Sequence, residues 1–414
     1  MEETNPQART RVLLSLLAVI VAAAALRLFL LAGPQTELEA DEAIVGLMAR
    51  HILHGERPLF YYMQPYMGSL EAYLIAALFA LFGSSTFVLK LVPMLGALLF
   101  VALLFVTGYR LRGLTAAIIA GLFGALPPAF LAIWSLKARG GYIEILVMGQ
   151  LLILMTMDLG KRGEIGWGRG FLIGAIAGLG LWTNPLIAVY LIPVAIYLIL
   201  VLRSRVFGWW LVPAAAGLLL GSAPLICYNL ATGFATGNLM DGGDGSGLEN
   251  APDYLRRTLR LCIPILAGLF QASSSPRLFG DALAANPLNR ALFAQSIAVP
   301  FVVLLIYGAR KLPALLRGHG ADRGELLLSL LMVTVPTVFV VTRFREMISE
   351  PRYLLPLYSA IPLMGSTLAS LRWPRARTIA LGAFVLVIVA NLIGVARLDP
   401  KLNLPDTVVG STAA

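Results

Sequence analysis

The apolar residues of this chain are gathered in long runs that recur from residue 12 to residue 396. A run of about 20 apolar residues can cross a hydrocarbon core of about 30 Å as one helix. Lipid offers no partner to a backbone N–H or C=O group, so helices are the expected spanning structures. Charged residues make up only 13% of the chain, against about 25% in soluble domains. The sequence therefore predicts an all-α, polytopic membrane protein.

We predict about eleven spans in a single transmembrane domain over residues 1–414, with the N-terminus in the cytoplasm. The first run is longer than the apolar core of a signal peptide and lacks a clean small-x-small cleavage site, so it is expected to be a retained anchor. The predicted spans are 12–32, 87–109, 114–134, 142–160, 170–183, 185–202, 208–230, 290–309, 324–343, 353–371 and 377–396.

The charges in the short loops give the predicted spans a direction. Sixteen of the 32 Lys and Arg residues, but only six of the 22 acidic residues, fall on one side. Basic residues gather in cytoplasmic loops, so the formal net charge of +10 belongs to the cytoplasmic face. It is an orientation signal, which argues against a nucleic-acid partner. The basic residues on this side are Arg9, Arg11, Arg110, Arg112, Lys161, Arg162, Arg169, Arg203, Arg205, Arg310, Lys311, Arg317, Arg323, Arg372, Arg375 and Arg377.

Two long loops are predicted on the outer side, at about residues 33–86 and 231–287, and long loops tend to carry function. In the first, apolar residues recur at helical spacing over residues 44–52, which predicts a helix lying on the membrane surface. Asp41 is expected to be the N-cap of this helix. Residues 69–82 are expected to form a second interfacial helix.

Ionisable residues gather near the outer ends of the predicted spans. Arg27 lies near the outer end of the first span and Lys90 near the outer start of the second, with Asp41 and Glu42 in the loop between them. Ionisable groups at membrane depth are costly, and they are usually functional or paired. A capping role and a chemical role for Asp41 are compatible, because a capping carboxylate is held rigidly and can still face a cavity.

Two further outer segments carry charge. Residues 137–144 read KARGGYIE, so that Glu144 opens the fourth span. Glu144 could bind substrate, or it could favour the positive end of its helix or pair with Arg139. Arg352 begins a span at the outer face, where it could bind a phosphate or extend toward the interface.

Acids and cations on one outer face suit the transfer of a sugar from a polyprenyl phosphate. The leaving phosphate is already ionised and needs cations, and one carboxylate can take a proton from the acceptor hydroxyl. No nucleotide-binding fold is needed, and the sequence has neither a Gly-rich phosphate loop nor a Ser/His/Asp set.

The chain resembles the dolichyl-phosphate-mannose protein mannosyltransferases and the bacterial aminoarabinose transferases of lipid A, within the glycosyltransferase C class. The resemblance covers nearly the whole chain in topology, although each motif is short. The stretches that carry it are Asp41-Glu42, Phe82-Gly83-Ser84-Ser85, Arg139 with Glu144, and Pro351-Arg-Tyr-Leu-Leu-Pro356.

The resemblance implies an inverting transfer with Asp41 as the general base and Glu42 beside it as the catalytic pair. Glu144 would occupy a second acidic position, which is usually an aspartate in the family. Residues 64–68 (QPYMG) stand where the family often has a charged residue followed by Pro-Pro. No sizeable soluble domain is expected at the C-terminus, so acceptor recognition is expected to come from the two outer loops or a partner. The candidate substrate-binding residues are Glu144, Arg139, Arg352, Arg27, Lys90, Tyr142 and Gln64.

No cofactor is required by this chemistry. The three histidines, His51, His54 and His319, are too scattered for a zinc site, and Cys227 and Cys262 belong to no metal-type cluster. A divalent cation shared by Asp41, Glu42 and Glu144 is left open, without a ligand spacing that supports it.

Two other classes of protein compete with this interpretation. A transporter or lipid flippase would place ionisable groups at mid-membrane and often has repeated halves, and no repeat is visible here. A non-catalytic membrane scaffold does not need acids on one face. The expected partners are a polyprenyl-phosphate sugar donor, a protein, lipid or glycan acceptor, and membrane lipids, with the chain in the cell (inner) membrane and its site on the extracytoplasmic face.

Overall fold

The structure is a computed structural model. It describes residues 6–33, 38–157, 165–236, 251–258, 323–341, 351–365 and 374–396, together with Leu159, Cys262 and Leu266. Most of the predicted second outer loop, the predicted span 290–309 and most of the loop at 310–323 lie outside these residues.

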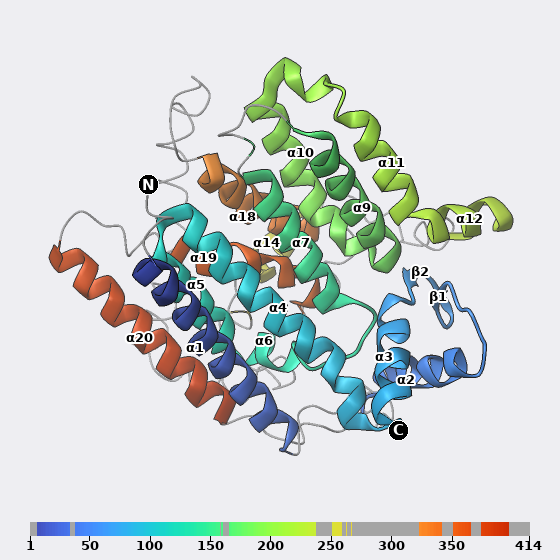
Figure 1. Ribbon diagram of the computed structural model, residues 1–414, viewed down its shortest axis with the longest axis horizontal. Helices are drawn as coiled ribbons and strands as arrows, with labels where there is room; N and C mark the ends of the chain where they lie inside the picture. The colour runs from blue at the N-terminus through green and yellow to red at the C-terminus, as the bar shows by residue number, and fades with distance from the viewer. Residues whose placement is uncertain are drawn as a thin grey trace.

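The described chain is almost entirely helical, as predicted (Figure 1). A short hairpin of β1 (Phe60–Tyr61) and β2 (Gln64–Gly68), which the sequence did not predict, interrupts the helices. The helices are α1 (Pro6–Leu31), α2 (Ala40–Leu53), α3 (Leu70–Phe82), α4 (Thr86–Arg112), α5 (Leu114–Ala125), α6 (Ala129–Trp134), α7 (Tyr142–Met157), α9 (Trp167–Thr183), η2 (Pro185–Ile187), α10 (Ala188–Leu202), η3 (Arg203–Phe207), α11 (Leu211–Gly221), α12 (Ala223–Thr232), α14 (Ala251–Arg257), α18 (Arg323–Val341), η7 (Pro351–Ser359), α19 (Ile361–Gly365) and α20 (Pro374–Ala396).

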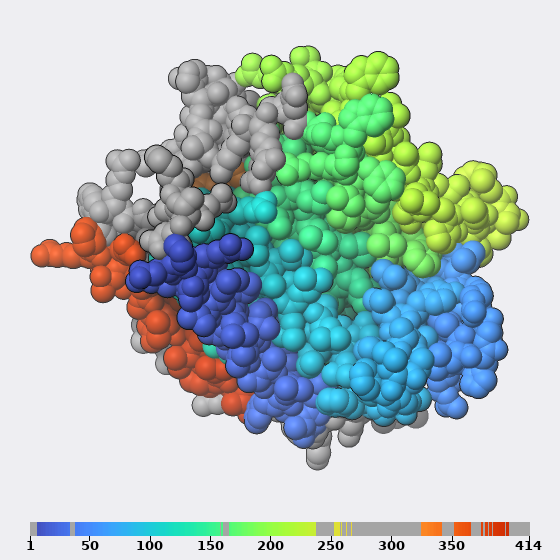
Figure 2. All heavy atoms as spheres, in the orientation of Figure 1, coloured from blue at the N-terminus to red at the C-terminus, as the bar shows by residue number. Residues whose placement is uncertain are grey.

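Several helices are long and apolar enough to cross a membrane. By length and composition these are Pro6–Leu31, Thr86–Arg112, Pro185–Phe207 and Gly324–Val341, and the bent pair α11–α12 can be counted as a fifth. The membrane class is therefore supported, whereas the count of eleven spans stays a prediction. In the space-filling view, α1 (dark blue) and α20 (red) lie side by side along one edge (Figure 2), and both carry large exposed apolar side chains, as lipid-facing helices do.

Prolines and a helix break divide three of the predicted spans. The span predicted at 114–134 consists of α5 and α6, because Pro127 and Pro128 lie between them and cannot donate to a helix ladder. The span predicted at 208–230 bends by 64° between α11 and α12. The span predicted as one helix at 353–371 begins within the 3-10 helix η7, which contains Pro356. Of this predicted span, residues 353–365 are described.

Two glycines one helical turn apart, Gly174 and Gly178, allow two helices to pack closely. A methyl group on Gly174 would overlap the carbonyl oxygen of Ala214, and one on Gly178 would overlap that of Leu218. The two glycines thus let α9 approach the backbone of α11, as small residues do between membrane helices. A larger core forms around α7, where α10, α18 and η7 supply the facing buried side chains.

The two ends of α4 carry different ion pairs. Lys90, near its N-terminus, pairs with Glu42 of α2, and Arg112, at its C-terminus, pairs with Glu325 of α18. The sequence predicted Lys90 and Glu42 near the outer side and Arg112 on the cytoplasmic side. The two ion pairs join opposite ends of α4 to different helices, and the orientation of α4 in the membrane stays a prediction.

The segment predicted as the first outer loop folds into a compact unit at one end of the bundle. Its elements are α2, the β1–β2 hairpin and α3, which pack on one another and on the start of α4 (Figure 1). The unit is held from a distance as well: Trp182, at the end of α9, donates its indole N–H to the carbonyl of Leu59 at 2.9 Å. The Phe60 ring lies 4.7 Å from that of Tyr228 on α12.

Candidate active site

The start of α2 brings three acids together in four residues. The N-cap residue is Glu39, whose backbone is extended (φ −76°, ψ 159°), and its N–H donates to the Glu42 carboxylate at 3.3 Å. Asp41 lies inside the first turn of the helix, so the prediction that Asp41 is the N-cap was wrong. The helix begins at Ala40, which leaves the carboxylate of Asp41 available for contacts outside the cap.

Glu42 and Lys90 form a buried ion pair. Lys90 Nζ donates to the two Glu42 oxygens at 2.6 and 2.8 Å, and the residues are only 1% and 3% exposed. The Ala138 N–H also donates to Glu42 at 3.1 Å. Both carboxylate oxygens of Glu42 are thus engaged, and the geometry suits joining α2, α4 and the loop before α7 better than removing a proton from a substrate.

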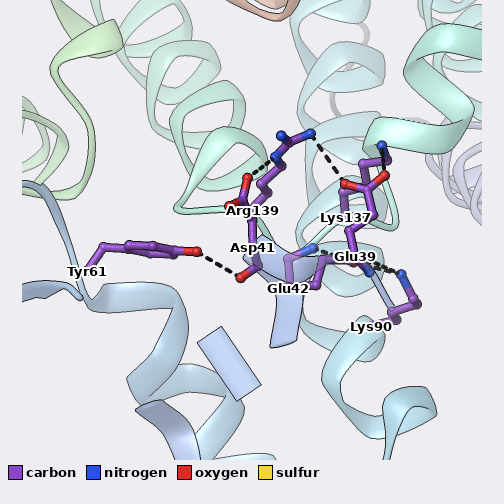
Figure 3. A network of polar contacts seen from close by, with 8 residues as sticks. Glu39, Asp41, Glu42, Tyr61, Lys90, Lys137 and Arg139 are labelled. Carbon is purple, nitrogen blue, oxygen red and sulfur yellow. Dashed lines mark hydrogen bonds and ion pairs between the residues drawn. The ribbon is translucent and has the colours of Figure 1, made fainter. Parts of the chain in front are cut away.

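Asp41 is the more accessible carboxylate of the predicted catalytic pair. Its side chain is 34% exposed, and Arg139 Nε donates to it at 2.6 Å. Arg139 also donates to Glu39 at 3.3 Å, and Lys137 pairs with the other Glu39 oxygen (Figure 3). The Tyr61 hydroxyl donates to the Asp41 carbonyl at 2.9 Å, and burial and the nearby Asp41 charge raise the pKa of this phenol.

Aromatic rings connect this cluster to η7. Arg139 and Lys137 lie over the Trp134 ring, 5.7 and 5.4 Å from its centroid, and Arg352 lies 5.3 Å from the centroid of the Tyr353 ring. The Tyr142 ring lies between the other two, with its centroid 5.0 Å from that of Trp134 and 6.3 Å from that of Tyr353. The guanidinium groups of Arg139 and Arg352 thus lie at opposite ends of one aromatic row, and each is of a type that binds phosphate. The three rings in order are Trp134, Tyr142 and Tyr353.

A second pair of carboxylates is more deeply buried than Asp41, and one of them contacts the loop that carries Arg139. Glu144, in the first turn of α7, is 9% exposed, and its Oε2 has no hydrogen-bond partner among the described residues. Glu71, in the first turn of α3, is 2% exposed and accepts the N–H groups of Gly140 and Gly141. Sequence reasoning missed Glu71. Its signal was an acid opening a short, otherwise apolar helix.

The remaining predicted site residues are placed differently. Arg27 is 1% exposed and donates to the carbonyls of Ala23, Gly124 and Ala125 at 3.1 Å each. These contacts fasten α1 to the end of α5, and the structure does not join Arg27 to the acidic cluster through any of them. Gln64 lies on β2 and accepts from the Tyr66 hydroxyl at 3.0 Å.

Within the described parts of the chain, no group of three or more His, Cys, Asp and Glu side chains could hold a metal ion. The expectation that no cofactor is required, with a divalent cation left open, stays a prediction.

The arrangement of the helices matches solved structures of membrane glycosyltransferases. ArnT from Cupriavidus metallidurans, bound to undecaprenyl phosphate, matches with a TM-score of 0.61 and 16% identity over 95% of this chain and 66% of ArnT. The apo state of that ArnT gives the same TM-score at 14% identity. The apo oligosaccharyltransferase of Archaeoglobus fulgidus matches with a TM-score of 0.52 and 14% identity, over 94% of this chain and 56% of that protein.

These matches define the class of fold. The chain has the fold of glycosyltransferases of the C class, so the resemblance inferred from the sequence is confirmed for the fold. It spans a little less than two thirds of the length of ArnT. No protein-family model and no curated protein matches the sequence.

Proposed function

We propose that this chain is a glycosyltransferase that moves a sugar from a polyprenyl phosphate to an acceptor hydroxyl on the extracytoplasmic side of the membrane. The observation that carries the proposal is the accessible Asp41 carboxylate, oriented by Arg139 in a cluster that also holds further cations. A fold shared with ArnT, which was solved with undecaprenyl phosphate bound, supports the donor class.

The proposed reaction is a single displacement that inverts the anomeric carbon. Asp41 takes the proton of the acceptor hydroxyl as the acceptor oxygen forms its bond to that carbon. The bond from the same carbon to the phosphate oxygen breaks, and its electron pair leaves with the polyprenyl phosphate. Arg139 and Arg352 would stabilise the charge on the departing phosphate, since guanidinium groups bind phosphate in a bidentate manner.

The other predicted residues take supporting roles in this proposal. Glu42 and Lys90 hold the helix that carries Asp41, and Glu144 and Tyr142 line the approach to the sugar. Gln64 would meet the donor from the hairpin. Arg27 was predicted to bind substrate, but its carbonyl contacts favour a role in helix packing.

A transporter or flippase is the alternative function. It would move the lipid without breaking the bond between sugar and phosphate. If the chain is a glycosyltransferase, membranes that contain it should release polyprenyl phosphate from a labelled polyprenyl-phosphate sugar in the presence of acceptor. Movement of intact labelled lipid between the leaflets, without cleavage, would support the alternative and contradict the enzyme.

Arg352→Ala is expected to weaken binding of undecaprenyl phosphate, and Arg352→Lys should restore only part of it, because lysine cannot make a bidentate contact. The affinity should fall by about tenfold or more for the alanine variant. Binding can be measured by native mass spectrometry of the detergent-purified protein. If both variants keep the wild-type affinity, Arg352 is an interfacial side chain only.

Single cysteines should establish the predicted orientation. Ser84, between α3 and α4, is predicted outside, and Ser204, in η3, is predicted in the cytoplasm; both are exposed. Each is replaced by cysteine in a chain lacking Cys227, which is exposed, and Cys262. An impermeant maleimide added to intact cells should label the first position and spare the second. Labelling of both from the same side would contradict the topology.

A further inference from the structure

Glu71 joins α3 to the loop that carries the cations of the cluster. Its Oε2 accepts the Gly140 N–H at 2.7 Å and the Gly141 N–H at 3.1 Å. The residue is 2% exposed, so water does not compete for these contacts. Two successive amides on one carboxylate oxygen form an anion-binding arrangement of the kind that consecutive backbone N–H groups make elsewhere in proteins.

The two glycines are needed for this geometry. Both have a φ of +84°, a backbone angle that residues with a Cβ rarely adopt. A Cβ on Gly141 would also lie 2.5 Å from the Thr183 methyl group. The Asn184 amide donates to the Gly140 carbonyl at 3.2 Å, so the turn is held from the end of α9 as well as from α3.

The segment fixed by these contacts leads directly into the cluster. Arg139, the residue before the turn, reaches Asp41 at 2.6 Å, and the Ala138 N–H reaches Glu42 at 3.1 Å. A displacement of the glycine turn would therefore move the guanidinium that orients Asp41. Errors of about 1 Å in such positions can cost about 100-fold in rate.

The surroundings of Glu71 agree with an internal role. Burial raises the pKa of this carboxyl well above its usual value, and the nearby charges of Glu144 and Glu42 act in the same direction, whereas the two amide contacts oppose them. A protonated carboxyl still accepts both N–H groups through its carbonyl oxygen. Glutamine has the same shape and the same acceptor.

We infer that Glu71 is a positioning residue, which acts through the Gly140–Gly141 turn to hold Arg139 against Asp41. This inference rests on the proposed function, since it takes the cluster around Asp41 as the substrate site. It assigns no direct contact between Glu71 and the substrate.

The test compares Glu71→Ala, Glu71→Asp and Glu71→Gln in the full chain, with Glu56→Gln as the matched control. Glu56 is an exposed acid of the same outer loop that accepts from Tyr62 at 2.6 Å. Two quantities are measured: amide hydrogen exchange over residues 138–143, and the affinity for undecaprenyl phosphate. The first reads the turn directly and needs no ligand.

Loss of the acceptor in Glu71→Ala should speed exchange of the Gly140 and Gly141 amides by about tenfold. The affinity for undecaprenyl phosphate should fall by about tenfold, because Arg139 is no longer held in place. Glu71→Gln and Glu56→Gln should match the wild type in both. In an Arg139→Ala background, Glu71→Ala should cause no further loss of affinity.

Several results would overturn the inference. These are unchanged exchange in Glu71→Ala, a wild-type affinity despite faster exchange, or a further loss in the Arg139→Ala background. If the alanine variant does not fold, Glu71→Asp decides, since its carboxylate is one methylene shorter and should show both changes while glutamine shows neither. If the wild type itself does not bind undecaprenyl phosphate, the proposed function fails, and the exchange result alone still confirms or contradicts the role of Glu71 in the turn.

Discussion

Asp41→Asn is expected to lower sugar transfer by about 100- to 10,000-fold, the usual contribution of a general base. The asparagine amide cannot accept the proton of an acceptor hydroxyl. The substitution also removes a negative charge beside the developing positive charge of the sugar. The amide oxygen can still accept a hydrogen bond from Arg139 Nε, which lies 2.6 Å from the carboxylate. The position of the side chain should therefore change little.

Folding should change much less than activity in this variant. Asp41 lies within the first turn of α2 rather than at its cap, so the cost is the loss of a favourable charge near the helix N-terminus, about 0.3–1 kcal/mol. Asp41→Ala should be equally inactive. Because Asp41 is not the cap, this variant should also avoid the larger loss of stability that follows removal of an N-cap. Transfer from a labelled polyprenyl-phosphate sugar is measured beside thermal unfolding in detergent. Glu56→Gln, at an exposed acid of the same loop, should keep both.

An active Asp41→Asn protein would contradict the assignment of the base. The carboxylates left to consider would be Glu144, which has an oxygen without a partner among the described residues, and Glu42, whose oxygens are engaged by Lys90 and Ala138. Glu144→Gln would then be the next variant to assay.

Lys90→Met is expected to destabilise the protein by about 3–5 kcal/mol, because it leaves the Glu42 carboxylate buried without its counter-charge. The two residues are 3% and 1% exposed and lie 48 positions apart in the chain. Methionine keeps most of the volume of the lysine stem, so the loss reports the charge rather than a cavity. The midpoint of thermal or denaturant unfolding in detergent measures the effect.

A double variant separates the charge from the packing. Adding Glu42→Gln to Lys90→Met removes the unpaired carboxylate and should recover a large part of the lost stability. Arg57→Met is a suitable control, since Arg57 is an exposed cation between α2 and β1 and its loss should stay within about 0.5 kcal/mol. If Lys90→Met is as stable alone as it is together with Glu42→Gln, the ion pair does not secure α2.

Local sequence patterns were sufficient for most of the helices and for the neighbourhood of the site. The apolar runs predicted α1, α4, α7 and α10, because a segment in lipid must satisfy its own backbone hydrogen bonds. Spacing within the predicted first outer loop indicated α2 and α3 close to their observed bounds. The charge pattern of the loops predicted that Asp41, Glu42 and Arg139 lie near one another, as they do in the structure.

What the sequence could not determine was which charge meets which. Asp41 and Glu42 are adjacent, yet α2 turns the first toward Arg139, 98 residues away, and the second toward Lys90. A helix rotates neighbouring side chains by about 100°, so their partners depend on which elements pack on each face. The role of Glu71 depends in the same way on α3 lying against a glycine turn some 70 residues later. Composition and periodicity thus predicted most of the helices and placed the charged residues in the loops between them, whereas long-range packing alone separated the accessible carboxylate from those engaged in holding the site together.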